Sequence, residues 1–139
     1  MAIRQIDRLA EMVKQVVNTS ELPESPFYSH AVKAGGLIYL SGFVGINPRT
    51  KKIEADTIEA QTQQAIQNCE TVLRTARSKL EDVVQVIVLL RDPADFDGMN
   101  GTYSKYFSKD PPARAVAKLG VEIPNVKISI MMTARANES

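Results

Sequence analysis

The stretch most informative about the fold is residues 57–90, TIEAQTQQAIQNCETVLRTARSKLEDVVQVIVLL. In its first part apolar residues recur at steps of three and four, which predicts a helix over 57–77. Asp56 is placed to cap this helix, and Glu59 stands at the third helical position, as in a capping box. One helical face holds Ile58, Thr62, Ala65, Ile66, Cys69, Val72, Leu73 and Ala76. We therefore expect Cys69 to be a small buried side chain in preference to a reactive thiol.

The end of the stretch, residues 83–90, predicts a strand, because it is rich in Val, Ile and Leu and has strand length. Alternation places its side chains on two opposite faces. One face holds Val84, Val86, Val88 and Leu90, and the other holds Val83, Gln85, Ile87 and Leu89. Since both sets are apolar, both faces of this strand are expected to be covered.

Working outward, the same patterns predict five more strands and a short N-terminal helix over 3–12. The strands are expected over 14–18, 29–33, 37–44, 113–119 and 126–134. In the strand 37–44, strict alternation places Phe43 on the face opposite to Ile38 and Leu40. In the last strand, Val126, Ile128, Ile130 and Met132 alternate with Lys127, Ser129, Met131 and Thr133.

A second helix is predicted over 92–107, with Asp92 as its cap and Pro93 at its first position. The element order is then β-ββ-α-β-α-ββ, in an α+β fold with an N-terminal extension over 1–13 and a single domain over 14–139. Two helices can cover only one face of a six-stranded sheet. Because the other face also carries apolar side chains, we expect a further subunit to cover it.

Composition excludes several function classes. Among 139 residues, 17 Lys and Arg against 16 Asp and Glu give a net charge of +1, which argues against a dedicated nucleic-acid binder. One cysteine and one histidine exclude an intramolecular disulfide and a zinc site built from several such ligands. No apolar run is long enough to cross a membrane, and no secretory or transit pattern is visible. We expect a cytoplasmic protein.

Arg114 is the first candidate for chemistry, since it begins a strand in which Ala113, Ala115 and Ala117 are small. Its guanidinium could hold a substrate carboxylate with two parallel hydrogen bonds. The alternative is a surface arginine at a strand end, and the residue pattern alone favours that alternative.

Four other side chains are weaker candidates. Asn100 shares one side of the second helix with Phe96, Met99, Tyr103 and Phe107, where a buried amide must find hydrogen-bond partners. Those partners are usually nearby backbone groups. Tyr28 and Ser41 belong to residue types that are common at strand ends. His30 has an ordinary pKa near neutrality, but a lone histidine in a strand is more often structural than catalytic.

Six segments together resemble the RidA family, also called YjgF-like proteins or L-PSP endoribonucleases. They are Pro26-Phe27-Tyr28-Ser29-His30-Ala31-Val32, Leu40-Ser41-Gly42, Asn47-Pro48-Arg49-Thr50, Glu59-Ala60-Gln61-Thr62, Asp95-Phe96 with Met99-Asn100 and Tyr103, and Pro112-Ala113-Arg114. Each segment alone is weak, but the six follow the family's order and spacing from about Lys14 to Ala134.

The resemblance implies a chorismate-mutase-like α+β subunit with a six-stranded mixed sheet and two main helices on one face. It also implies a homotrimer with ligand sites between subunits, no cofactor and no metal. The family's activity is hydrolysis of reactive enamines and imines, such as 2-aminoacrylate, to a 2-keto acid and ammonia. Arg114 matches the arginine that binds the small carboxylate substrate, and Tyr28, Ser41 and Asn100 match other residues of the cleft.

One position departs from the family in a way that affects the chemistry. Fifteen residues after Arg114, where the deaminases usually hold a glutamate that orients water, this chain has Ser129. Met131 likewise stands where a second glutamate is frequent. A serine hydroxyl can hydrogen-bond a water but is no effective base near pH 7, so weakened or redirected deamination is expected. His30 or Glu122 could substitute as the base.

Three functions follow from these observations. The first is an enamine or imine deaminase in which Arg114 and Ser129 are catalytic. The second is a non-catalytic binder of small carboxylates, with a regulatory role, that keeps Arg114 after loss of the glutamate. The third is the ribonuclease or translation-inhibitor role of the family's older name. The near-neutral charge weighs against this third function, because phosphate contacts dominate nucleic-acid binding.

Overall fold

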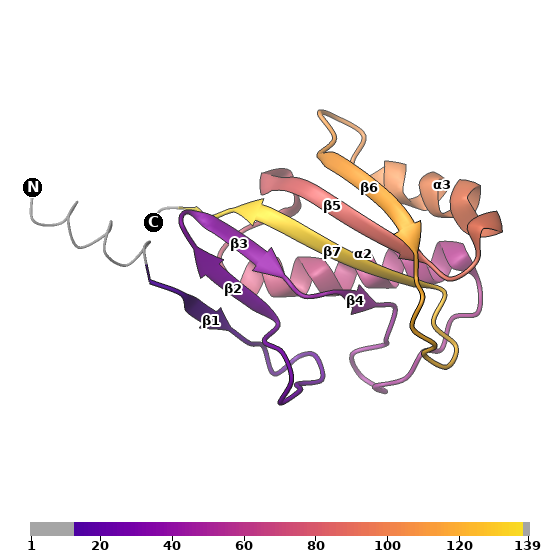
Figure 1. The fold of residues 1–139 in the computed structure, drawn as a ribbon, viewed down its shortest axis with the longest axis horizontal. Helices are drawn as coiled ribbons and strands as arrows, with labels where there is room; N and C mark the ends of the chain where they lie inside the picture. Colours follow the sequence, from indigo (N-terminus) through magenta and orange to yellow (C-terminus); the bar gives the residue numbers. More distant parts are fainter. Residues whose placement is uncertain (1–12, 138–139) are drawn as a thin grey trace, which may run out of the picture.

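The computed structural model describes residues 13–137, which form one mixed β-sheet with two α-helices against one of its faces (Figure 1). The helices are α2 (Ile58–Thr75) and α3 (Phe96–Tyr106), and two short 3-10 turns are η1 (Leu80–Asp82) and η2 (Pro93–Asp95). The strands are β1 (Gln15–Val17), β2 (Ala31–Ala34), β3 (Leu37–Leu40), β4 (Phe43–Val44), β5 (Val83–Leu90), β6 (Ala113–Lys118) and β7 (Ile128–Arg135). The predicted α+β class is confirmed. The helix predicted over 3–12 lies outside the described residues.

The strands are ordered β1-β2-β3-β7-β5-β6, and β4 also pairs with β7. Only β5 and β6 run parallel; the other pairs are antiparallel. The described residues form seven strands instead of the six expected, because the strand predicted over 37–44 is interrupted at Ser41-Gly42. The interruption turns Phe43 to the face that holds Ile38 and Leu40, so the predicted placement of Phe43 on the opposite face was wrong.

Helix α2 agrees with the predicted helix but begins with a different cap. The hydroxyl of Thr57 accepts a hydrogen bond from the backbone N–H of Ala60 at 3.2 Å, so Thr57, and not Asp56, is the capping residue. Both residue types make good caps, and Thr57 has the extended backbone that a cap requires. At the other end Arg77 adopts a left-handed backbone with φ of 65°, which stops the helix two residues earlier than expected.

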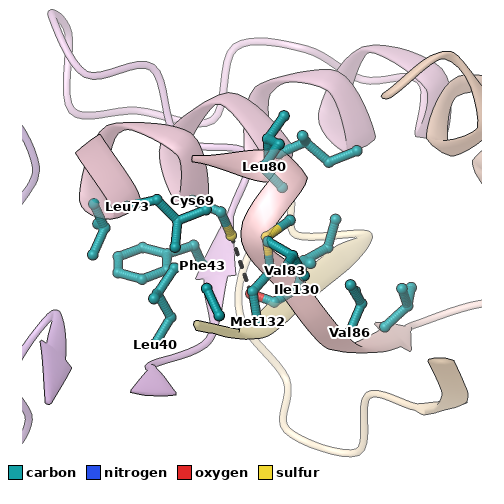
Figure 2. Packing of buried hydrophobic residues seen from close by; sticks show 14 of the residues in the cluster. Leu40, Phe43, Cys69, Leu73, Leu80, Val83, Val86, Ile130 and Met132 are labelled. Atoms are coloured by element: carbon teal, nitrogen blue, oxygen red, sulfur yellow. Dashed lines mark hydrogen bonds between the residues drawn. The ribbon is translucent and has the colours of Figure 1, made fainter. Parts of the chain in front are cut away.

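The face of the sheet under the helices forms the core. Helix α2 packs on β7, β4 and β3 and against α3. Figure 2 shows Cys69 and Leu73 of α2 beside Phe43, Ile130 and Met132 of the sheet. The Cys69 thiol is fully buried, donates a weak hydrogen bond to the carbonyl of Ile130, and has its pKa raised by burial. The expectation that Cys69 is a buried apolar side chain is confirmed.

The opposite face of the sheet, hereafter the open face, has no helix over it in the described part of the chain (Figure 1). A register shift in β5 between Val83 and Gln85 sends Val83 into the core and leaves Val84 exposed, which reverses the predicted faces of these two valines. Val16, Tyr39 and Met131 on the open face are 55%, 48% and 39% exposed. The helices within residues 13–137 therefore cover only one of the two apolar faces that the sequence predicts to be covered.

Candidate functional site

Arg114 lies on β6, the last strand of the sheet, and points to the helix-covered side. Its register partner on β5 is Val86, which is fully buried in the core. The alternating Ala113, Ala115 and Ala117 consequently fall on the open face. The Arg114 side chain thus reaches helix α3 at the edge of the sheet, where it stays accessible to solvent.

Helix α3 supplies the surroundings of the guanidinium. Arg114 Nη1 donates a short hydrogen bond of 2.6 Å to Asn100 Oδ1 and lies 3.9 Å from Met99 Sδ. The guanidinium carbon is 4.8 Å from the ring centroid of Tyr103 and 5.9 Å from that of Phe96. Both rings are within the range of a cation–π interaction.

The charge of Arg114 is not compensated by an ion pair. Within residues 13–137 the one salt bridge joins Arg135 to Asp82. An arginine held by neutral groups and free of carboxylates can accept one from a ligand through two parallel hydrogen bonds. The arrangement therefore fits a site for a small carboxylate.

Tyr103 is buried beside this arginine. Its hydroxyl has no hydrogen-bond partner in the described part of the chain. Burial raises the pKa of Tyr103, and the nearby positive charge of Arg114 opposes that rise. The phenol is therefore neutral at physiological pH, and its ring is the part that contacts Arg114.

A second group of predicted residues gathers at the interruption between β3 and β4. Ser41 Oγ donates a hydrogen bond of 2.6 Å to the carbonyl of Ser29, which follows the half-exposed Tyr28 in the chain. Ser129 of β7 lies against Gly42: a Cβ atom added to Gly42 would come within 2.9 Å of Ser129 Oγ. Tyr28, Ser41 and Ser129 thus belong to one region, which we call the Ser129 region.

The two groups lie on opposite faces of the sheet. Ser129 pairs with Leu89, which pairs in turn with Ala117, so these three residues share the open face. Arg114 is three residues away from Ala117 on β6 and points to the other face. The backbone positions of Arg114 and Ser129 are about 10 Å apart across the strands and about 10 Å apart along them. One chain therefore cannot present Arg114 and Ser129 to the same small molecule.

The surroundings of Ser129 are neutral. Its register partners are Val44 and Leu89, and Met131 lies two residues further along the same face. Its hydroxyl forms no hydrogen bond with the residues that the structure describes. These neighbours supply no base.

His30 cannot replace the missing carboxylate in this conformation. Its ring is buried, with Nδ1 accepting from the Thr19 backbone N–H at 3.0 Å and Nε2 donating to the Pro23 carbonyl at 2.7 Å. Both ring nitrogens are engaged in hydrogen bonds, so His30 has a structural role. The sequence favours the same interpretation, because a lone histidine in a strand is more often structural than catalytic. Glu122 is exposed in the segment between β6 and β7.

A hollow of about 750 Å³ lies elsewhere, beyond the ends of β5 and β6. Its lining includes Arg91, Lys118 and Lys127 together with four carboxylates. None of the predicted site residues lines it. We place the candidate site at Arg114 because the polar contacts there converge on one uncompensated charge, whereas the hollow is a wide depression of mixed charge.

From the sequence, the three residues that surround Arg114 besides Asn100 were not proposed as site residues. Phe96, Met99 and Tyr103 share the helical stripe of Asn100, and this stripe predicts core packing. Met99 and Tyr103 are buried, as this stripe predicts. Together with the exposed Phe96 they also surround the guanidinium of Arg114. The amide of Asn100 within an otherwise largely apolar helical stripe was the available signal.

Comparisons with known proteins agree with this architecture. The family model described as Endoribonuclease L-PSP matches residues 18–136. The chain is similar to the chloroplastic Reactive Intermediate Deaminase A of Arabidopsis thaliana, with 37% identity over 84% of this chain and 63% of that protein. It is also similar to a 2-iminobutanoate/2-iminopropanoate deaminase of Dermatophagoides farinae, with 32% identity over 84% of this chain and 92% of that protein.

The likeness extends to the three-dimensional structure. The crystal structure of the YjgF gene product of E. coli matches 88% of this chain and 99% of its own, with a TM-score of 0.80 and 28% identity. A match of the family model over most of the chain, two relatives above 30% identity and a shared fold all point the same way. The chain therefore belongs to the L-PSP endoribonuclease family, which is the RidA or YjgF family.

Proposed function

We propose that this protein hydrolyses reactive 2-imino and 2-enamino acids to 2-keto acids and ammonia. The observation that carries the proposal is Arg114, whose guanidinium is held by Asn100 and two rings and forms no ion pair in the described chain. The names of two relatives, a reactive intermediate deaminase and a 2-iminobutanoate/2-iminopropanoate deaminase, support the same reaction class.

The proposed chemistry needs binding, orientation and one water. Arg114 binds the substrate carboxylate and draws electrons away from the neighbouring imine carbon. A 2-enamino acid first becomes the imine, as its Cβ gains a proton and its nitrogen loses one. Water then adds to the imine carbon, and the C–N bond of the resulting carbinolamine breaks to release ammonia and leave the 2-keto acid. No electrons are gained or lost overall. The Ser129 hydroxyl and backbone carbonyls near Val116 would hold the water.

The separation of Arg114 from the Ser129 region makes the proposed site a shared one. Because the two groups face opposite sides of one chain, a complete site needs Arg114 from one chain and Ser129 from another. The open face, with Val16, Tyr39 and Met131 partly exposed, offers the apolar surface for such an association. We propose a homotrimer with three sites between subunits.

The neutral surroundings of Ser129 support a second candidate function. Without a base, the protein could bind 2-keto or 2-imino acids at Arg114 and not turn them over, as a regulator would. Both candidates share the carboxylate site and differ in the rate of the chemical step.

The decay of 2-iminopropanoate in a coupled assay, with and without protein, tests the proposal. Wild type should accelerate the decay, and Arg114→Ala should return it to the rate in buffer. Ser129→Glu should increase the acceleration by about 10²–10⁴-fold if the missing carboxylate limits catalysis. If 2-iminopropanoate decays at the buffer rate with both wild type and Arg114→Ala, the proposed deaminase activity is contradicted. Saturable, Arg114-dependent binding of 2-ketobutyrate without acceleration supports the binder instead.

A further inference from the structure

We propose that Tyr103 and Asn100 are positioning residues that orient Arg114, so that the Nε–Nη2 edge of its guanidinium receives the ligand carboxylate. This inference rests on the proposed carboxylate site and deepens it by naming the edge that binds. In this inference Asn100 binds and orients Arg114, whereas the family resemblance implies that Asn100 contacts the substrate.

The choice of edge follows from how the donors of Arg114 are used. Nη1 donates to Asn100 Oδ1 at 2.6 Å and lies 3.9 Å from Met99 Sδ, so this nitrogen faces the protein. A guanidinium has two edges with parallel N–H groups, one between Nη1 and Nη2 and one between Nη2 and Nε. The first edge includes Nη1, which already faces the amide and the sulfur. The second has no partner in the described chain and remains for a bidentate carboxylate.

The orientation of the guanidinium plane follows from the aromatic contacts. Tyr103 and Phe96 lie 4.8 Å and 5.9 Å from the guanidinium carbon, and both belong to α3. Tyr103 is buried and packs on Phe107 with ring centroids 4.8 Å apart, so its ring is fixed by the core. A fixed ring restricts the rotation of the long arginine side chain before any ligand arrives. Preorganisation of this kind increases affinity, because less freedom is lost on binding.

Calorimetry with 2-ketobutyrate, a stable keto acid, tests the proposal in four variants of the full chain. Tyr103→Leu removes the ring, and Tyr103→Phe keeps the ring while removing a hydroxyl without a partner. Asn100→Asp places a carboxylate beside Nη1 that would pair with Arg114 internally. Phe107→Leu is the matched control, since it removes the other ring of the same aromatic pair and this ring does not contact Arg114.

We expect Tyr103→Leu to weaken binding by about three- to tenfold, and Tyr103→Phe to restore most of the lost affinity. Asn100→Asp should weaken binding by at least about tenfold, because its carboxylate competes with the ligand. Phe107→Leu should lower the melting temperature and leave the dissociation constant within about twofold. A structural role alone would instead change the melting temperature in both Tyr103→Leu and Phe107→Leu and leave both dissociation constants alone.

The failures of the two proposals are distinguishable. If wild type binds 2-ketobutyrate, Arg114→Ala does not, and Tyr103→Leu and Asn100→Asp bind like wild type, this inference is overturned and the carboxylate site stands. If Tyr103→Phe loses as much affinity as Tyr103→Leu, the ring is not the positioning group. If wild type shows no Arg114-dependent binding, the carboxylate site and this inference both fail.

Discussion

The two faces of the sheet differ in how far one chain completes them. On the helix-covered face, Ile130 and Met132 of β7 are fully buried against α2. On the open face, Met131 of the same strand is 39% exposed and Tyr39 of β3 is 48% exposed. Both faces are apolar, yet the part of the chain that the structure describes covers only one of them. The first face holds the buried core of the chain, and the second is the one that we propose for association.

The same difference separates the two halves of the proposed site. Arg114 stands at the edge of the covered face, where helix α3 holds it in place. Ser129 stands on the open face, next to the interruption at Gly42. Catalysis by this protein is therefore proposed to depend on association, because only a second chain can bring the two faces together.

The largest expected effect is the loss of a core side chain from the covered face. Ile130→Ala should lower the free energy of unfolding by about 2–5 kcal/mol, because it leaves a cavity under α2. Met131→Ala should cost less than about 1 kcal/mol in dilute protein, where the open face of the chain meets water. Chemical denaturation at several protein concentrations measures both. Equal losses for the two neighbouring residues at every concentration would contradict the distinction between the faces.

The next effect is on assembly. Tyr39→Asp should yield single chains that keep their far-ultraviolet circular dichroism spectrum, because a charge on the open face would be buried without a partner in the oligomer. Sedimentation velocity measures the mass. Gln67→Asp, on the exposed side of α2, is the matched control and should leave the mass unchanged. A Tyr39→Asp protein with the wild-type mass would show that the open face is not the interface.

The smallest effect concerns Arg135, which projects from the open face and reaches the buried carboxylate of Asp82 at 3.0 Å. Burial raises the pKa of Asp82, but hydrogen bonds from Arg135 and Asn137 and the charges of Arg135 and Lys79 outweigh it and lower the pKa overall. The carboxylate therefore stabilises the fold above its unfolded pKa of about 4, and this contribution is lost as the pH falls through the lower folded value.

Asp82→Asn should accordingly cost about 1–2 kcal/mol near neutral pH and flatten the decline of stability as the pH falls below about 4. Urea denaturation across that range, with Glu81→Gln as the neighbouring control, checks the expectation. An acid decline of unchanged steepness in Asp82→Asn would mean that another group causes it.

Much of the fold was predictable because it rests on long periodic patterns. Helix α2 and strands β5 and β7 follow from patterned runs of eight or more residues, so one irregular residue does not hide them. The errors lie where one residue changes the period: the register shift at Val83 and the interruption at Ser41-Gly42 each exchange the two faces of a strand. Gly42 is a weak local signal for the interruption, whereas nothing in the local sequence marks the shift at Val83, which tertiary packing decides.

The sequence alone suffices to propose Arg114 as the centre of the candidate site, but not to propose what surrounds it. Arg114 stands out in the sequence through its small neighbours and the family resemblance. Its contacts with Tyr103 and Phe96 depend on how α3 crosses β6, which residue patterns do not determine. The separation of Arg114 from Ser129 likewise appears only once the register of β5, β6 and β7 is known.

The central claim is that each site takes Arg114 from one chain and the Ser129 region from another. Complementation tests it most directly: Arg114→Ala chains and Tyr28→Ala/Ser129→Ala chains are unfolded, mixed in equal amounts and refolded together. Each variant alone should leave 2-iminopropanoate to decay at the buffer rate. The mixture should regain hydrolysis at about a quarter of its sites. In random assembly, half of the sites receive an intact Arg114, and half of these also receive an intact Ser129 region. Mixed oligomers that form without any recovered hydrolysis would contradict the account.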